Sequence, residues 1–277
     1  FLSYEQLILR QPEVVNAGSI IVPSDLERKG DFSQSAVKPK LPAGTNCGTT
    51  AAPVICPAAL DPVAQNLLQY VPHADSAGVA PQQSAPANSN SYQGLARIDY
   101  NGLNRHSLEL MYFNTQGNSV DPLAGGNDLI GYSGMIDTEN QTNAVLADNW
   151  TINYRTVNSA RLFYTLNKYL IDNLHQGQFL ADLGSEAPEG GSVYSPPQFV
   201  VNGDFTAGPS GAGPSTDIQG SMGVIDTGTL NRGSHSLKIG GSFVWNKYNA
   251  DSGNVSAGHF GFANNSSVSG GTALGDF

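Results

Sequence analysis

The sequence predicts an all-β fold, a section of a large antiparallel transmembrane β-barrel with long extracellular loops. Three observations predict it. Stretches of about 10–15 residues alternate apolar and polar side chains, whereas ordinary globular strands average about half that length. Tight turns join these stretches in pairs, and long connections rich in Gly, Pro, Ser and Asn separate the pairs. Outer-membrane barrels combine short turns with long loops in this way, but such connections are uncommon inside compact soluble domains.

The composition is turn-rich and poor in charge. Of 277 residues only 13% are charged and 39% are hydrophobic, while 32 are Gly and 16 are Pro. No apolar run approaches the roughly 18 residues of a membrane-spanning helix, which excludes a helical membrane protein. The net charge of −10 argues against a nucleic-acid binder, because phosphate contacts need a basic surface. A barrel strand needs apolar side chains at every second position only, so it tolerates this composition.

We expect about eight long strands. The clearest alternation lies in 91–101, where Ile98 and Tyr100 fall on an apolar face and Arg97 and Asp99 on a polar one. This pattern is typical of a strand with two different environments on its faces. The expected strands are 1–10, 91–101, 105–115, 141–153, 157–170, 217–229, 234–249 and 256–263.

We expect residues 11–90 to form one long extracellular loop that contains two short helices. Ser24 and Glu27 have the spacing of a capping box at the start of the first helix, and Gly30 is a suitable terminator. Asp61 is an N-cap for the second helix, which opens with a proline. Both helices are expected to be structural and to hold the loop in place.

Cys47 and Cys56 are the two cysteines of the sequence. In an oxidising compartment they would pair as a candidate disulfide that closes a short loop. The alternative is two unrelated free thiols. A zinc site is not expected, because no neighbouring His or Cys pair completes four ligands.

The sequence offers no catalytic constellation. The five histidines lack metal-ligand spacing, and no nucleophile-elbow or phosphate-loop motif is present. We therefore expect no enzyme activity, no cofactor and no metal. The candidate binding residues are charged side chains expected to face the barrel lumen, where they pair with a plug or with each other more readily than with substrate: Arg97, Asp99, Arg161 and Lys238.

Aromatic residues near the ends of the expected strands are candidates for the lipid interface, where Trp and Tyr gather in barrels. They are Tyr92, Tyr100, Tyr112, Trp150, Tyr169, Trp245 and Tyr248.

Several segments match sequence motifs of one family, and they occur in the same order as in that family. They are Phe1–Glu5, Val22–Ser24, Glu27–Ser33, Asp61–Leu68 with Val71–Pro72, Ala96–Tyr100 with Asn104–His106, His235–Gly241 and Thr272–Phe277. In these segments the chain resembles the TonB-dependent outer-membrane receptors of the Oar-like type. Each match is weak alone, but the ordered set spans nearly the whole chain. The segment from Cys47 to Cys56 differs from the Gly/Pro-rich loop sequence that is more usual in the family.

The resemblance implies a 22-stranded barrel in a Gram-negative outer membrane, an N-terminal plug, often a carboxypeptidase-regulatory-like domain, and energy from the TonB complex. Neither plug nor N-terminal domain is visible in the sequence, so residues 1–277 are expected to be part of one barrel domain of a longer chain. The implied partners are outer-membrane lipid, the TonB complex through the missing N-terminal part, and an unknown extracellular ligand.

The expected function is therefore TonB-dependent uptake of an unidentified bulky nutrient by the whole receptor, and this segment supplies part of the barrel. One alternative is a surface or secreted β-rich structural or adhesion protein without transport activity. Another is a soluble β-sandwich enzyme or carbohydrate-binding module. The long polar loops suit the first alternative, and the absence of catalytic motifs weakens the second.

Overall fold

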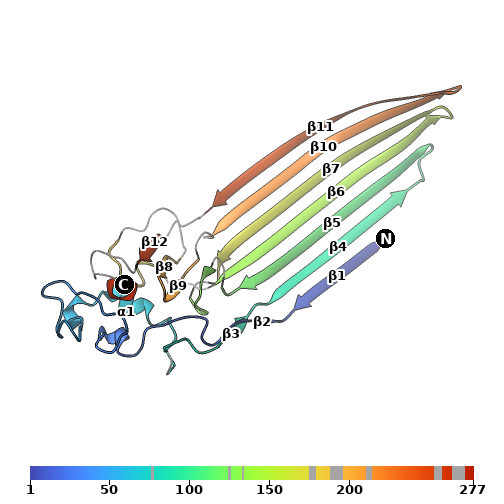
Figure 1. Cartoon of the computed structure of the whole chain (residues 1–277). Coiled ribbons are helices and arrows are strands. Elements are labelled where there is room, and N and C mark those ends of the chain that lie inside the picture. Colours follow the sequence, from blue (N-terminus) through green and yellow to red (C-terminus); the bar gives the residue numbers. More distant parts are fainter. Residues whose placement is uncertain are drawn as a thin grey trace.

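The computed structural model contains one wide antiparallel sheet with all its long connections gathered at one end (Figure 1). It describes residues 1–75, 78–123, 126–132, 134–174, 179–187, 196–209, 214–252, 258–263 and 272–277. The strands of the sheet, in spatial order, are β1 (Leu2–Leu9), β4 (Ser89–Tyr100), β5 (His106–Asp121), β6 (Met135–Asn153), β7 (Thr156–Asn173), β10 (Ser215–Arg232) and β11 (His235–Ser252). The all-β prediction is confirmed.

The strands are longer than a bilayer crossing requires. In β5, β6, β7, β10 and β11 there are 16 to 19 residues each, whereas a tilted strand crosses the hydrocarbon core of a bilayer with about 9–11. In a bilayer, part of each of these five strands would therefore extend beyond the hydrocarbon core. Near the long connections both faces of the strands carry Asn, Gln, Thr and Ser, so this is the part that lies in water.

Three tight turns close the hairpins at the opposite end of the sheet, here called the turn side (Figure 1). The turn between β4 and β5 places Arg105 at a φ of 68°, and the turn between β10 and β11 places Gly233 at 60°. Arginine rarely adopts this left-handed region. Its guanidinium donates a hydrogen bond of 2.8 Å to the carbonyl of Ile152 in the neighbouring hairpin, so the first turn is braced against the second.

The hairpins are staggered along the sheet. Tyr100, the last residue of β4, shares a row with Leu108 and Asp148, but β6 continues beyond that row to Asn153. β10 in turn continues beyond the row of Thr156. Strands that tilt within a barrel need this stagger if their turns are to end near one membrane plane.

The two faces of the sheet differ in chemistry. One row across six strands is entirely apolar and consists of Ile98, Leu110, Leu146, Leu162, Val224 and Phe243; its face is called the outward face. A row on the other face is polar across all seven strands and consists of Glu5, Gln93, Thr115, Gln141, Asn167, Gln219 and Tyr248; its face is called the inward face. The apolar faces expected for the separate hairpins thus join into one surface.

The long connections form a separate folded body at the other end of the sheet, here called the loop assembly. It contains two small sheets, β2 (Pro12–Val15) with β3 (Gln83–Pro86), and β9 (Phe205–Ala207) with β8 (Gln198–Val201) and β12 (His259–Phe262). Its short helices are η1 (Glu27–Lys29), η2 (Pro57–Ala59), α1 (Pro62–Leu67) and α2 (Ala273–Asp276).

One hydrophobic core holds the loop assembly together. Leu67 comes from the connection between β1 and β4, Tyr132 from the one between β5 and β6, Phe205 from the one between β7 and β10, and Ala273 from the segment after β11; all four are essentially inaccessible to solvent. Tyr70 packs against Tyr132 with ring centroids 5.3 Å apart. In the described part of the main sheet only Met135 and Ala147 are buried apolar residues, so this assembly is the conventional core of the molecule.

Of the two short helices expected in residues 11–90, the second is an α-helix in the structure and the first is only a 3-10 turn. The second is α1, whose N-cap Asp61 accepts hydrogen bonds from the backbone N–H groups of Val63 and Ala64. The first is reduced to the single 3-10 turn η1, which Gly30 ends at a φ of 77°. Its capping contacts are made, but no apolar stripe follows them to extend a helix into the core.

The expected eighth barrel strand, 256–263, is wrong. Residues 256 and 257 lie outside the described residues, and 259–262 form β12, which pairs in parallel with β8 inside the loop assembly. Phe260 stacks on Phe199 with ring centroids 5.2 Å apart. Alternation in so short a segment predicts a strand but does not predict which strand it pairs with. Here the aromatic residues of β12 pack in the core of the loop assembly. The main sheet therefore has seven strands.

Among the described residues, no helix is long and apolar enough to cross a membrane.

Replacing Leu67 by Ala should loosen the whole loop assembly, because this side chain is fully buried in the shared core. The expected cost is about 2–5 kcal/mol, measured as faster backbone hydrogen exchange in all the connections of the membrane-embedded protein. Val37→Ala, at a side chain 65% exposed, is the control and should change little. Faster exchange confined to α1 would contradict a shared core.

Candidate functional site

The outward face carries an apolar band that water cannot solvate well. Leu162, on the central strand β7, is 53% exposed, and Phe243, on the edge strand β11, is 69% exposed, although both are large apolar side chains. A soluble protein rarely leaves so extensive an apolar surface uncovered. Lipid chains are a suitable environment for it, since the sheet pairs its backbone groups internally.

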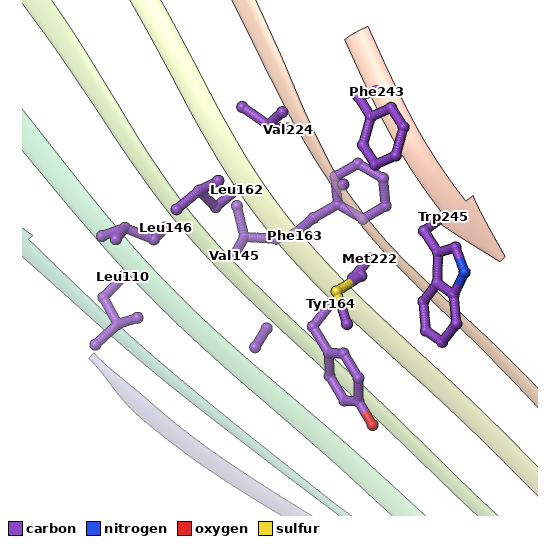
Figure 2. Close-up of a pocket in the computed structure, with 12 residues that line it drawn as sticks. Leu110, Val145, Leu146, Leu162, Phe163, Tyr164, Met222, Val224, Phe243 and Trp245 are labelled. Atoms are coloured by element: carbon purple, nitrogen blue, oxygen red, sulfur yellow. The ribbon is translucent and has the colours of Figure 1, made fainter. Parts of the chain in front are cut away.

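The middle of this band contains a shallow hollow of about 500 Å³ (Figure 2). Leu110, Leu146 and Leu162 lie on one side of it, and Met222 and Trp245 on the other (Figure 2). The side chains that line it are apolar apart from the hydroxyl of Tyr164 and the indole N–H of Trp245. It therefore resembles a surface for acyl chains more than a site for polar chemistry.

Aromatic residues occur at both margins of the band. On the turn side, Trp150 lies outward and its ring stacks on His106 with centroids 5.4 Å apart; His106 Nδ1 also contacts the Asp148 carboxylate at 2.7 Å. On the loop side, Tyr112, Tyr164 and Trp245 share one outward row. This distribution is typical of the interface belts of barrels.

Two of the aromatic residues expected at the lipid interface do not lie there. Tyr169 and Tyr248 are on the inward face, in register with polar residues such as Glu139 and Gln219. The Tyr248 hydroxyl donates to the Asp217 carboxylate at 3.3 Å. Their nearness to the strand ends was the only sequence signal, and it does not distinguish the two faces.

The charged residues expected to face the lumen all lie on the inward face. Arg97 forms an ion pair with Asp99, 2.9 Å from Nη2 to Oδ1, and a second with Glu109, 3.2 Å from Nη2 to Oε2. Glu109 was missing from the candidate residues. Its position directly opposite Asp99 in the hairpin was the signal that could have identified it. The triad is half exposed, so each pair contributes little stability.

Arg161 and Lys238 are not part of this triad. Arg161 shares a row with Asp99 and Glu109, but Ala147 separates it from them. Lys238 is further along the same face, opposite Thr229. Within the described residues neither cation has an ion pair. Two cations on the inward face thus remain available to groups that fill the space beside the sheet.

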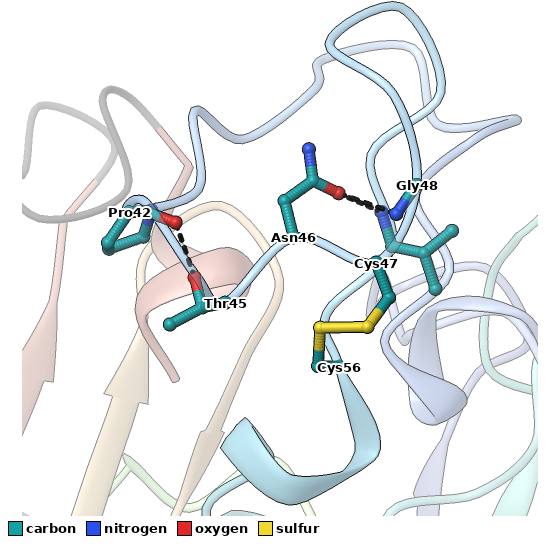
Figure 3. The surroundings of a disulfide bond; sticks show 7 residues. Pro42, Thr45, Asn46, Cys47, Gly48 and Cys56 are labelled. Carbon is teal, nitrogen blue, oxygen red and sulfur yellow. Dashed lines mark hydrogen bonds between the residues drawn. A yellow bond between two sulfur atoms is a disulfide. The ribbon is translucent and has the colours of Figure 1, made fainter.

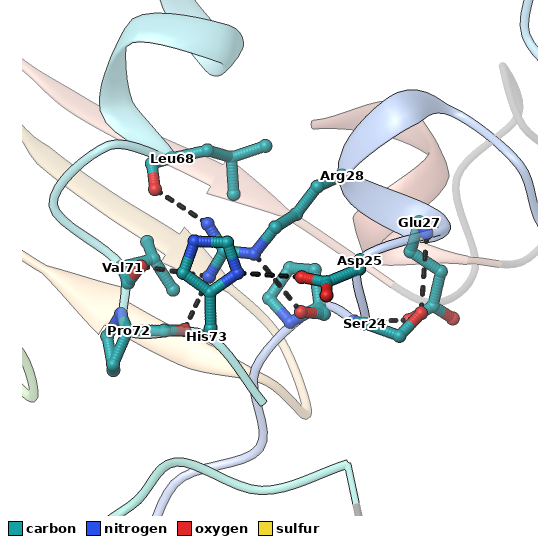
Figure 4. A network of polar contacts seen from close by, with 9 residues as sticks. Ser24, Asp25, Glu27, Arg28, Leu68, Val71, Pro72 and His73 are labelled. Atoms are coloured by element: carbon teal, nitrogen blue, oxygen red, sulfur yellow. Dashed lines mark hydrogen bonds and ion pairs between the residues drawn. The ribbon is translucent and has the colours of Figure 1, made fainter. Parts of the chain in front are cut away.

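In the loop assembly, Arg28 joins two segments of the first connection (Figure 4). Its guanidinium donates to the carbonyls of Leu68 at 2.8 Å and Val71 at 2.9 Å, and also to that of Pro72. These carbonyls follow the end of α1 and need donors. Because a planar guanidinium presents several donors at fixed angles, it suits this position better than lysine.

Next to Arg28, Asp25 and His73 form a surface ion pair at 2.6 Å (Figure 4). The hydrogen bond from His73 holds the pKa of Asp25 below its usual range. On the other side, the Glu27 carboxylate accepts hydrogen bonds from the N–H of Ser24 at 2.9 Å and from its hydroxyl at 2.8 Å. The predicted capping box is therefore closed around η1.

Glu27 also lines a hollow of about 340 Å³ together with Asp204, which lies between β8 and β9. Burial, reinforced by the negative charge of Glu27, raises the pKa of Asp204 to about 6. This is an acidic recess with apolar walls such as Phe32. Among the described residues, no group of three or more His, Cys, Asp or Glu is arranged to hold a metal ion.

The structure joins Cys47 and Cys56 by a disulfide with an S–S distance of 2.06 Å (Figure 3). The backbone N–H of Cys47 donates to the carbonyl of Val54 at 2.8 Å. Asn46 Oδ1 accepts from the N–H groups of Gly48 at 2.9 Å and Val54 at 3.1 Å. The segment is thus an irregular hairpin closed at its base by the two sulfur atoms.

Replacing both Cys47 and Cys56 by Ser should open this hairpin. For residues nine apart in sequence, the lost loop constraint corresponds to about 2–3 kcal/mol. Hydrogen exchange of the amides in 45–56 should accelerate, while exchange in β7 stays unchanged as an internal control. Unaltered exchange in 45–56, together with two titratable thiols in the native protein, would show that the cysteines are free.

The stability of the loop assembly should depend on the protonation of Asp204. Because the folded pKa is raised to about 6 from 3.8, the stabilising contribution of the neutral form is present at acid pH and is lost as the pH rises through about 6. Asp204→Asn should remove this slope. Comparing unfolding of the two proteins between about pH 4 and pH 7 tests it, with exposed Glu13→Gln as control. A constant difference across this range would contradict the shift.

Comparison with known proteins supplies the family. The whole chain, residues 1–277, matches the family described as "Outer membrane beta barrel domain". No curated protein matches the chain, and no solved structure does. The match agrees with the apolar band, the paired backbone and the turn-and-loop asymmetry of the sheet. The chain therefore belongs to the outer membrane beta-barrel domain family, whose location is the outer membrane of Gram-negative bacteria.

Proposed function

We propose that this chain is part of the barrel of a TonB-dependent receptor of the Oar-like type, which imports a bulky nutrient. The observation that carries the proposal is the polar row that crosses all seven strands on the inward face, from Glu5 to Tyr248, although a neighbouring inward row contains Met111, Val145 and Phe163. Small barrels fill their interior with their own packed side chains, but this face offers a wall that is mostly polar or charged. Such a wall suits an interior filled by water or by a folded plug.

The edges of the sheet support a wide barrel. β1 and β11 each pair on one side only within the described residues. In a bilayer both edges must be paired, so further strands have to close the sheet. More strands give a larger interior, and a plug domain needs such an interior.

The inward cations support a plug contact. Arg161 and Lys238 face the interior without an ion pair among the described residues. Arg161 shares a row with Asp99 and Glu109 of the internally paired triad, whereas Lys238 lies on the edge strand β11. In this proposal carboxylates of the plug pair with the two cations at rest.

The segments that resemble the Oar-like receptors also have structural roles here: Asp61–Leu68 caps and forms α1, and Arg28 joins η1 to the end of α1.

A binding and labelling experiment on the intact outer-membrane protein tests the proposal. The periplasmic domain of TonB should bind the purified protein. A cysteine at Arg161→Cys should react slowly with a membrane-impermeant maleimide because a plug covers it. Leu162→Cys, the next residue on the outward face, is the matched control for lipid protection. Absence of TonB binding with rapid labelling at position 161 would overturn the proposal and favour an unplugged barrel with an adhesive role.

A further inference from the structure

We propose that the outward face carries a binding site for lipid A, the phosphorylated and acylated glucosamine disaccharide of the outer leaflet. The site lies around Gly220 at the loop-side margin of the apolar band. Lys168 and Lys247 supply the charge, and the hollows beside Gly220 receive an acyl chain. The inference is independent of what the barrel transports.

The charges of the strands are sorted between the two faces. In the half of the sheet near the loop assembly, Lys168 and Lys247 are the strand cations in the described residues, and both are outward. Most carboxylates of that half are inward: Glu5, Asp121, Asp137, Glu139 and Asp217. Cations on a lipid-facing surface attract anionic headgroups and not the interior of the barrel.

The two lysines lie at the depth of a headgroup. Lys247 follows the interfacial Trp245 by two positions, and Lys168 follows outward Leu166 by two. The outward carboxylates Asp172 and Asp251 come four positions later on the same strands, about 13 Å further toward the loops. They are too far along the strands to neutralise the lysines. Neither lysine has an ion pair among the described residues.

The stagger of the hairpins brings both lysines to one level. Lys247 is opposite Gly220, whereas Lys168 is opposite Ile218, one row further toward the loops. Because the strands of a barrel tilt, residues at one membrane depth lie in different rows on β7 and β11. The shift of one row between Lys168 and Lys247 therefore brings them to similar depths. Two strand spacings, about 10 Å, separate them, so both ammonium groups can reach phosphate above β10.

Gly220 leaves a gap between the lysines. A hollow of about 190 Å³ opens here, lined by Tyr164, Leu166, Ile218, Met222, Trp245 and Lys247 beside the glycine. Tyr164, Met222 and Trp245 also line the apolar hollow of Figure 2. A charged rim thus leads into apolar hollows, and lipid A has the same order of groups, with phosphate above acyl chain.

The backbone does not require glycine at this position. A Cβ on Gly220 would meet its nearest atoms at 3.7 Å and 3.8 Å, which is ordinary contact, and its φ is not positive. At Gly223, by contrast, a Cβ would approach the carbonyl oxygen of Phe243 at 2.6 Å. The absent side chain at Gly220 therefore keeps outward space open and is not demanded by sheet packing.

Lipid binding to the intact protein in neutral phosphatidylcholine nanodiscs tests the site. The probes are lipid A, enzymatically dephosphorylated lipid A and phosphatidylglycerol, with binding measured by native mass spectrometry. Lys168→Gln with Lys247→Gln should weaken lipid A binding about thirtyfold, which corresponds to about 2 kcal/mol or about 1 kcal/mol for each lysine. Gly220→Leu should also weaken it, because the side chain fills the gap.

Matched variants separate the site from general effects. Lys238→Gln removes a cation from the inward face of β11. Gly228→Leu adds a side chain to the outward face of β10, the face of Gly220, where a Cβ has 3.9 Å of clearance; both variants should bind lipid A like the native protein. Equal binding of dephosphorylated lipid A overturns the proposal without any variant. Equal losses in Gly228→Leu and Gly220→Leu, or phosphatidylglycerol bound as tightly as lipid A, also overturn it.

Discussion

The obligation to pair every backbone N–H and C=O group inside hydrocarbon determines the rest of this structure. The sheet meets it through antiparallel ladders that join all seven strands, with one register shift between β6 and β7 at Thr151 to Asn153. Once the ladders exist, side chains can only point outward or inward. In the apolar band the outward positions are apolar, whereas the inward positions are mostly polar apart from the row of Met111, Val145, Phe163 and Val244. The usual hydrophobic core lies in the loop assembly and not in the sheet.

The hairpins could be predicted because lipid and water impose a period of two on the sequence. In β7, Leu162 and Tyr164 alternate with Arg161 and Thr165, and the structure places them on opposite faces. The loop-side ends of β5 (116–121) and β6 (135–140) were missed, because positions 116–119 and 137–140 have no apolar side chain on either face. There the strands are joined by the backbone ladder and by side-chain hydrogen bonds such as that from Asn114 to Asn140, and no apolar alternation in the sequence indicates a strand.

The loop assembly and the charged triad depend on contacts that sequence patterns do not encode. The burial of Leu67 next to Tyr132 requires two connections to meet in space, and β12 joins β8 because Phe260 finds Phe199. Arg97 and Asp99 were identified as candidates, but the role of Glu109 follows from the register across the turn. Local signals such as the Asp61 cap could be read directly, since their partners are two or three residues away.

Because three connections and the segment after β11 share one core, the loop assembly behaves as a single cooperative unit and not as four independent segments. Displacing one segment exposes apolar surface on the other three, so local opening costs nearly as much free energy as opening the whole. The strands of the main sheet anchor this unit, since each of its segments begins or ends in one of them. A displacement at the mouth of the barrel is therefore transmitted to several strands together, and substitutions in one of the four segments are constrained by the other three.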